Sequence, residues 1–218
     1  MHKIYTHETL TIEAFENVHV RDRFSILSES LELAPAVGHI MEFGVFQGKI
    51  INFLAGMAPG RQVHGFDSFE GLPEAWTRTT AGGSYPKGHF DLKGQLPIVK
   101  NNVDLFKGYF EDTLPEWLVN HPGNVAFIHN DSDLYSSTIY VLKQLNRRIT
   151  PGTVIVFDEL CDWDNVFGAT RPQFNAKPTY DNWRLHEWKA LLEWMKECNR
   201  KISIIGRGQL FQAAVIVA

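Results

Sequence analysis

Cysteine is scarce in this chain of 218 residues, and long apolar runs are absent. The two cysteines, Cys161 and Cys198, lack the spacing of a metal-binding motif, so we expect reduced thiols in a cytoplasmic protein. The longest apolar run is the final AAVIVA, which is far too short to span a bilayer. The first fifteen residues also lack the apolar stretch of a signal peptide. We therefore expect a soluble protein.

An excess of positive charge is also missing. The 21 Lys and Arg residues and 25 Asp and Glu residues give a formal net charge of −4, which gives no reason to expect nucleic acid or an anionic membrane as partner. A hydrophobic content of 44% in a chain of this length favours one domain, residues 1–218, with a sizeable core. The expected partner is a small molecule, and assembly into a homo-oligomer is left open.

Short apolar segments alternate with helical patterns along the chain. The predicted strands are 39–44, 62–67, 103–109, 124–130 and 153–158. This alternation predicts a parallel sheet covered by helices on both faces. The end of the chain breaks the alternation, because KISIIG and LFQAAVIVA, separated by RGQ, indicate an antiparallel hairpin.

Three further segments lie outside this alternation. Residues 6–34 suggest one or two amphipathic helices with an apolar face made of Phe15, Val18, Phe24, Leu27 and Leu31. Residues 68–100 and 159–182 are longer than simple connections need and contain several aromatic residues. Long loops of this kind are often functional, so we predict that both are lids.

Acids and glycines follow each predicted strand. Ligands of parallel α/β sheets bind beyond the carboxyl ends of the strands, so these residues define the candidate site. They are Glu42, Gly44, Gly48, Asp67, Gly108, Asp131, Asp133, Asp158 and Glu159. Because like charges repel, so many acids at one edge of a sheet suggest that something binds there.

The first of these strand ends, EFGVFQG (residues 42–48), lacks the G-x-G-x-x-G spacing of nicotinamide-binding proteins. Gly44 and Gly48 would let the backbone approach a ligand, and the helix that follows would offer free N–H groups. A plain turn followed by a helix-packing glycine is the alternative. Asp67, 19 residues after Gly48, could accept both hydroxyls of a ribose, or it could cap the turn that follows it.

Two neighbouring strand ends, HNDSDLY and VFDEL, carry the remaining acids. Asp131, Asp158 and Glu159 could converge on a hard divalent cation such as Mg²⁺, which prefers oxygen ligands. Without a metal, these acids would be helix caps and a solvated side chain. Asp133 is predicted to cap the helix that starts near Leu134, because Asp is favoured at that position.

The assembled pattern resembles the class I S-adenosylmethionine-dependent methyltransferases. More narrowly, it is similar to the macrocin O-methyltransferase group, which methylates sugar hydroxyls in natural-product pathways. The resemblance covers roughly residues 20–218 and rests on EFGVFQG, GFDSFEGLPE, KGYFEDTLPEWL, HNDSDLYSST and PGTVIVFDEL, in that order. It implies a Rossmann-like α/β fold, in which a doubly wound, mostly parallel seven-stranded sheet ends in an antiparallel hairpin.

The resemblance also implies residue roles. The cofactor-binding residues would be Glu42, Gly44, Val45, Phe46, Gly48, Asp67, Ser68, Phe69, Gly108, Tyr109, Phe110 and Asp131. The metal-binding positions of the metal-dependent members match Asp131, Asp158 and Glu159, although the family often has Asp where Glu159 stands. Asp131 or His129 would accept the proton from the substrate.

The predicted function is therefore S-adenosylmethionine-dependent O-methylation of a sugar or a natural-product-like small molecule, with Mg²⁺ as a possible second cofactor. The protein's tasks would be to position the acceptor, exclude water and remove a proton. Two alternatives remain open. An aminopropyltransferase-like enzyme on the same fold would need an acidic pocket matched to a polyamine. A non-catalytic module would bind S-adenosylmethionine without turnover.

Overall fold

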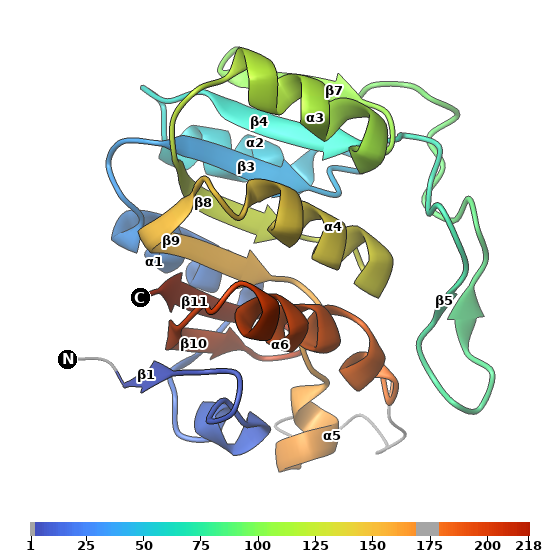
Figure 1. Ribbon diagram of the computed structural model, residues 1–218. Coiled ribbons are helices and arrows are strands. Elements are labelled where there is room, and N and C mark those ends of the chain that lie inside the picture. Colours follow the sequence, from blue (N-terminus) through green and yellow to red (C-terminus); the bar gives the residue numbers. More distant parts are fainter. Residues whose placement is uncertain (1–2, 169–178) are drawn as a thin grey trace.

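A mixed sheet organises the chain, and the computed structural model describes residues 3–168 and 179–218 (Figure 1). Seven strands form the body of the sheet in the order β10-β11-β9-β8-β3-β4-β7. Their bounds are β3 (His39–Phe43), β4 (Val63–Asp67), β7 (Val103–Lys107), β8 (Val125–Asn130), β9 (Ile149–Phe157), β10 (Ile202–Gly208) and β11 (Ala213–Val217). Strand β11 runs antiparallel to both β9 and β10. The predicted α/β class and the antiparallel hairpin at the end are confirmed.

Helices cover both faces of this sheet (Figure 1). One face carries α1 (Arg23–Leu33) and α2 (Lys49–Met57), and the other carries α3 (Phe110–Asn120), α4 (Tyr135–Leu145) and α6 (Glu187–Glu197). Each face has its own apolar cluster of side chains from the helices and the sheet. Strand β8 is buried along its whole length, which explains why its apolar run shows no polar alternation.

The N-terminal segment differs from the prediction. In residues 6–34 the only α-helix is α1, preceded by a 3-10 turn (Ile12–Phe15) and by β2 (Val20–Arg21). Strand β2, like β1 (Ile4–Tyr5), adds a short strand beside β10. The predicted single apolar face is wrong, because Phe15 packs on one side of the sheet and Leu27 on the other. The chain passes around the edge of the sheet here, so its apolar residues serve both faces.

The carboxyl ends of the central strands are level with one another. Phe43 of β3 pairs with Asn130 of β8, which pairs with Phe157 of β9. The backbone continues this ladder one residue further. The Asp131 N–H donates to the Phe43 carbonyl oxygen at 2.8 Å, and the Asp158 N–H donates to that of Asn130 at 2.9 Å. The register therefore brings two acids together beside β3, where the direction of strand order reverses.

The predicted lid segments extend beyond these strand ends. Residues 68–100 contain a small separate hairpin, β5 (Trp76–Thr77) and β6 (Ser84–Tyr85), which lies beyond the main sheet (Figure 1). Residues 159–182 contain α5 (Trp163–Phe167), but part of this segment lies outside the described residues. A second 3-10 turn (Trp183–Leu185) leads into α6. Among the described helices, none has the length and apolar character needed to cross a membrane.

Candidate active site

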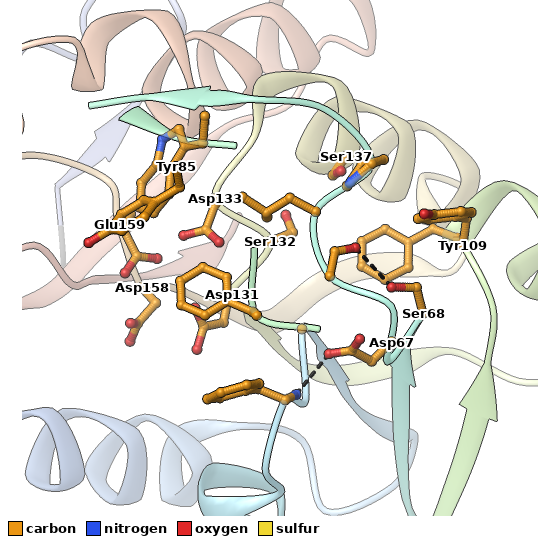
Figure 2. A pocket seen from close by; sticks show the side chains of 18 of the residues that line it. Asp67, Ser68, Tyr85, Tyr109, Asp131, Ser132, Asp133, Ser137, Asp158 and Glu159 are labelled. Atoms are coloured by element: carbon orange, nitrogen blue, oxygen red, sulfur yellow. Dashed lines mark hydrogen bonds between the residues drawn. The ribbon is translucent and has the colours of Figure 1, made fainter. Parts of the chain in front are cut away.

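A cavity of about 290 Å³ opens at the carboxyl ends of the central strands. It brings together nine of the residues predicted to bind the cofactor or a metal: Gly44, Phe46, Asp67, Ser68, Tyr109, Phe110, Asp131, Asp158 and Glu159. Figure 2 shows Asp67, Ser68 and Tyr109 at one end and Tyr85 and Glu159 at the other, with Asp131 between them. The cavity thus has two ends that meet at a carboxylate.

The other predicted residues do not line the cavity. Four of them, Glu42, Val45, Phe69 and His129, are buried behind it. Gly48 is the N-cap residue of α2, where a Cβ would face Pro97, and a Cβ at Gly108 would face Thr113. Their predicted part in the site stays a prediction.

Asp67 fixes the loop that follows β3. Its Oδ2 accepts hydrogen bonds from the backbone N–H groups of Val45 and Phe46, both at 2.8 Å. Its Oδ1 accepts a hydrogen bond from the Phe69 N–H at 2.7 Å, so Asp67 also caps the turn that follows it, which was the alternative role predicted for it. A carboxylate has about four acceptor positions, and three are used here. One acceptor position remains for a ligand hydroxyl, whereas the sequence predicted that Asp67 would contact both ribose hydroxyls.

Gly44 is a glycine for a reason of packing. Its φ is +90°, and a Cβ there would lie 1.8 Å from the carbonyl oxygen of Asp131. No side chain fits at that distance, so the glycine allows the loops after β3 and β8 to touch. The sequence predicted that a ligand would approach the backbone of Gly44. In the structure the group that lies close to it is the backbone of Asp131.

Arg23, at the first position of α1, joins two of the predicted acids. Its Nη2 lies 2.7 Å from Asp131 Oδ2, and its Nε lies 2.9 Å from Asp158 Oδ1. Burial alone would lower the pKa of the guanidinium, but the carboxylates of Asp158 and Asp131 raise it above its usual value. Arg23 therefore stays charged and neutralises part of the acidic cluster.

His129 lies beneath this ion pair and is fully buried. Its Nδ1 is 2.8 Å from Glu42 Oε1, and its Nε2 is 3.5 Å from Asp158 Oδ1, an ion-pair distance without hydrogen-bond geometry. Burial by itself lowers the pKa of His129, yet the carboxylates of Asp158 and Glu42 raise it to about 10. The imidazole is thus a buried cation at neutral pH, which does not favour its predicted role as proton acceptor.

Asp131 has the position and the protonation state of a proton acceptor. It lines the cavity, and its side chain is 24% exposed. Burial, followed by the negative charge of Asp158, raises the pKa of Asp131 to about 7. Near neutral pH the Asp131 carboxyl group is therefore ionised in a large share of the molecules, and it faces the cavity. Among the residues predicted to be catalytic, Asp131 alone has this combination.

Asp133 is not the helix cap that the sequence suggested. The N-cap position of α4 belongs to Leu134, which makes no side-chain cap hydrogen bond. Asp133 has a left-handed backbone, with φ +62°, and its side chain lines the cavity instead. Burial and the neighbouring acids Asp131 and Glu187 raise its pKa well above the usual value. The cap prediction was wrong because the N-cap lies one residue later and an N-cap residue has an extended backbone, whereas that of Asp133 is left-handed.

Two overlapping groups of residues offer metal ligands within 4.8 Å of one another. They are His129, Asp131 and Asp158, and Asp131, Asp133 and Glu159. Asp158 and Glu159 fall in different groups, so the predicted set of three is not brought together as one. Arg23 bridges the acids of the first group. The second group consists only of carboxylates, and Glu159 Oε2 is buried without a hydrogen-bond partner among the described residues. This oxygen-only set fits a hard cation such as Mg²⁺.

The geometry agrees with the family comparisons. The family model described as Macrocin-O-methyltransferase (TylF) matches residues 21–181, well over half of the chain. The chain belongs to this family. The resemblance seen in the sequence is therefore confirmed.

Known relatives of this macrocin O-methyltransferase family member include a 4'-O-methyltransferase of 8-demethyl-8-(2,3-dimethoxy-alpha-L-rhamnosyl)-tetracenomycin-C from Streptomyces olivaceus. The two are 29% identical over 175 residues, which cover 67% of this chain and 66% of the relative, just under two thirds of its length. Among solved structures, the calicheamicin methyltransferase CalS11 superposes with a TM-score of 0.59 at 22% identity, covering 88% of this chain and 76% of that one.

A further solved structure is MycE, a methyltransferase of the mycinamycin biosynthetic pathway in complex with Mg and SAH. It superposes with a TM-score of 0.52 at 14% identity and covers 89% of this chain and 49% of its own. At these identities the two solved structures establish the shared fold and nothing finer.

Several cavity residues of this family member had no predicted role in the site. They are Arg23, Gly71, Leu72, Pro73, Trp76, Arg78, Tyr85, Phe90, Glu111, Ser132 and Ser137. Most belong to the loop after β4, where the aromatic content of the sequence indicated a lid without showing which side chains face inward. Arg23 carried no signal, because a single arginine at the start of a helix is common on protein surfaces.

Proposed function

We propose that this protein transfers the methyl group of S-adenosylmethionine to a sugar hydroxyl of a natural-product-like small molecule. One observation carries the proposal: Asp131 lies in the middle of a cavity that has the loop-fixing Asp67 at one end and a group of acids and aromatic rings at the other (Figure 2). Membership of the family supports it, as does the relative named for O-methylation in a rhamnosyl-tetracenomycin. The substrate of this chain is inferred from that name by analogy.

The end of the cavity near Asp67 suits the cofactor. Asp67 holds one acceptor position open, and Ser68 and Tyr109 line the same end with polar groups. The rings of Phe46 and Phe110 also line the cavity and supply apolar surface that excludes water. This mixture of apolar surface with a few fixed polar groups is typical of small-molecule sites.

When bound, S-adenosylmethionine supplies a methyl group that is already activated. The remaining tasks fall to the chain. Asp131 accepts the proton of the acceptor hydroxyl as the oxygen gains the methyl group. Arg23 holds the Asp131 carboxylate from one side at 2.7 Å, so that its free oxygen faces the cavity. Fixing a base within reach of the acceptor contributes about 10²–10⁴-fold to the rate.

We propose further that a divalent cation, Mg²⁺ by chemistry, is held by Asp131, Asp133 and Glu159. This set replaces the predicted one because oxygens of Asp131, Asp133 and Glu159 lie within 4.8 Å of one another, whereas Asp158 does not belong to that group. When bound there, the cation would act as a Lewis acid that lowers the pKa of the acceptor hydroxyl. The buried, unpartnered Oε2 of Glu159 supports this assignment.

Calorimetric titration with S-adenosylmethionine and S-adenosylhomocysteine, with Mg²⁺ or with a chelator, tests the cofactor. We expect micromolar binding of both by the unmodified protein and a clear loss in Asp67→Asn. The matched control is Asp104→Asn, an exposed acid on β7. Failure of both compounds to bind would contradict the proposed function.

Methyl transfer from labelled S-adenosylmethionine to a rhamnoside then tests catalysis. Transfer to the sugar oxygen is expected. Binding without transfer to any glycoside would favour the alternative of a non-catalytic module. The aminopropyltransferase alternative is disfavoured by the family to which the chain belongs.

A further inference from the structure

The β5–β6 hairpin is fastened to the segment that precedes α6. Thr80 donates two hydrogen bonds to the Asp181 carboxylate, from its backbone N–H at 2.7 Å and from Oγ1 at 2.8 Å. His186 Nε2 lies 3.1 Å from the Thr77 carbonyl oxygen. Two segments that are far apart in the sequence therefore form one wall on the side of the cavity opposite Asp67.

Arg78 stands in this wall, surrounded by aromatic rings. Its guanidinium carbon lies 4.8 Å from the ring centroid of Trp76, 5.1 Å from those of Tyr180 and Phe211, and 5.9 Å from that of Tyr85. Packing against several rings holds an arginine in one orientation and still leaves its N–H groups available for hydrogen bonds. Trp76, Arg78 and Tyr85 all line the cavity.

Three polar atoms at this end of the cavity have no hydrogen-bond partner among the described residues. They are Trp76 Nε1, Arg78 Nε and Glu159 Oε2, and each is buried. Trp76 is only 2% exposed, so its N–H is withheld from bulk water. Native proteins rarely leave buried donors and acceptors unpaired, because each carries the cost of desolvation. The wall is therefore complete only when a ligand or ordered water meets it.

We propose that Trp76, Arg78 and Tyr85 form the acceptor subsite, that this subsite binds a pyranose ring, and that Arg78 determines its specificity. The inference rests on the proposed function and names the residues that select the acceptor. The half-buried Tyr85 ring contacts the C–H face of the sugar. Trp76 Nε1 and Arg78 Nε donate to its oxygens.

The chemistry of the wall favours a sugar over other ligands. The hydroxyl and ring oxygens of a sugar accept hydrogen bonds, so they can satisfy both donors, Trp76 Nε1 and Arg78 Nε. A purely apolar ligand would satisfy neither of them.

The position of the subsite also agrees with the reaction. Figure 2 shows Tyr85 and Glu159 on one side of Asp131 and Asp67 on the other. A ring held at the Tyr85 end would present a hydroxyl toward Asp131, the proposed proton acceptor. Asp131 lies between the two ends, so the hydroxyl that it deprotonates would lie close to the cofactor.

Saturation-transfer NMR with methyl α-L-rhamnopyranoside, with and without S-adenosylhomocysteine, tests the subsite directly. We expect the unmodified protein to bind the glycoside and Arg78→Ala to bind it about tenfold more weakly. Arg78→Lys should recover part of this loss, because it keeps the charge but not the fixed fork of N–H groups. Trp76→Phe keeps the ring, lacks the indole N–H and should bind the glycoside less tightly than the unmodified protein.

The control is Arg147→Ala, which makes the same change at an exposed position beyond α4. All variants should bind S-adenosylhomocysteine as the unmodified protein does, which also shows that they are folded. No glycoside binding by the unmodified protein, or equal binding by the Arg78 and Trp76 variants, would overturn the subsite. Glycoside binding without any S-adenosylhomocysteine binding would instead retain the subsite and refute the methyltransferase proposal.

Discussion

Arg23 and Asp131 form an ion pair of 2.7 Å although 108 residues separate them in the sequence. The same guanidinium reaches Asp158 at 2.9 Å. Arg23 therefore stands against two acids that the sequence alone had assigned to a metal. A fixed positive charge at this position lowers the electrostatic attraction of the site for a cation.

Replacing Arg23 by alanine is expected to strengthen cation binding. The change removes a positive charge next to Asp131 and releases Asp158 Oδ1 as a further ligand. We expect Mg²⁺ or Mn²⁺ to bind about tenfold more tightly, as measured by calorimetric titration. Arg21→Ala is the matched control, since Arg21 pairs with Glu29 on the surface. Weaker cation binding in Arg23→Ala would show instead that the guanidinium positions the metal ligands.

Replacing Asp131 by asparagine is expected to abolish most of the methyl transfer. The side chain keeps its size but can no longer accept a proton, so kcat should fall by about 10²–10⁴-fold. Binding of S-adenosylhomocysteine should be largely preserved, because Asp67 and its loop are untouched. Single-turnover transfer from labelled cofactor measures the first quantity, and calorimetry measures the second. An Asp131→Asn protein with unchanged kcat would assign the proton to another group.

The strand ends were predictable because their pattern is local. Each apolar run ends in an acid or glycine, and parallel strands bring such ends to one edge, which is why Gly44, Asp131 and Asp158 meet there. Glu42 and His129 offered a further signal. They occupy paired positions on adjacent buried strands, and two polar residues so placed can form an internal pair.

The rest of the site depends on tertiary structure. The ion pair of Arg23 arises only when α1 packs on the sheet, and no local pattern reports that contact. Asp133 faces the cavity because its backbone is left-handed, which a residue type alone does not specify. The wall around Arg78 is formed by two segments that only the folded chain brings together. Sequence reading found loops rich in aromatic residues but not which side chains point inward.

Gly44→Ala is expected to be far more disruptive than the same change at Gly60. The new methyl group at residue 44 would meet the Asp131 carbonyl oxygen at 1.8 Å, and the backbone there is left-handed. At Gly60 no heavy atom lies within 4 Å of the added carbon. Urea unfolding should show a loss on the order of 3 kcal/mol for Gly44→Ala and about 0.5 kcal/mol or less for Gly60→Ala. Equal stability of the two variants would contradict the close contact.

A chain of hydrogen bonds joins three buried or half-buried rings: Trp117 on α3, His64 on β4 and His39 at the start of β3. Trp117 Nε1 donates to His64 Nδ1 at 3.3 Å, so the proton of the neutral His64 ring sits on Nε2. His64 Nε2 lies 3.3 Å from His39 Nδ1, and His39 Nε2 lies 3.1 Å from the Pro122 carbonyl oxygen. The chain runs in one direction, and protonating His64 at Nδ1 would break its first link.

This arrangement predicts a loss of stability in acid. Burial, followed by the charges of His39 and His121, lowers the pKa of His64 from 6.5 to about 4. Between pH 6.5 and pH 4, His64 binds a proton in the unfolded chain but not in the folded chain. The unfolding free energy therefore decreases as the pH falls. The contribution of His64 is present above pH 6.5 and amounts to about 3 kcal/mol when fully lost.

Urea unfolding of the unmodified protein and of His64→Gln at pH 7, 6, 5 and 4 separates this effect from the titration of the carboxylates, which both proteins share. The glutamine has no ionisable group, so its unfolding free energy should fall less steeply over this range. His19→Gln, a change at an exposed histidine, should follow the unmodified protein. If His64→Gln lost stability as steeply as the unmodified protein, the acid sensitivity would have to arise elsewhere, with the half-buried His39 as the next ring to replace.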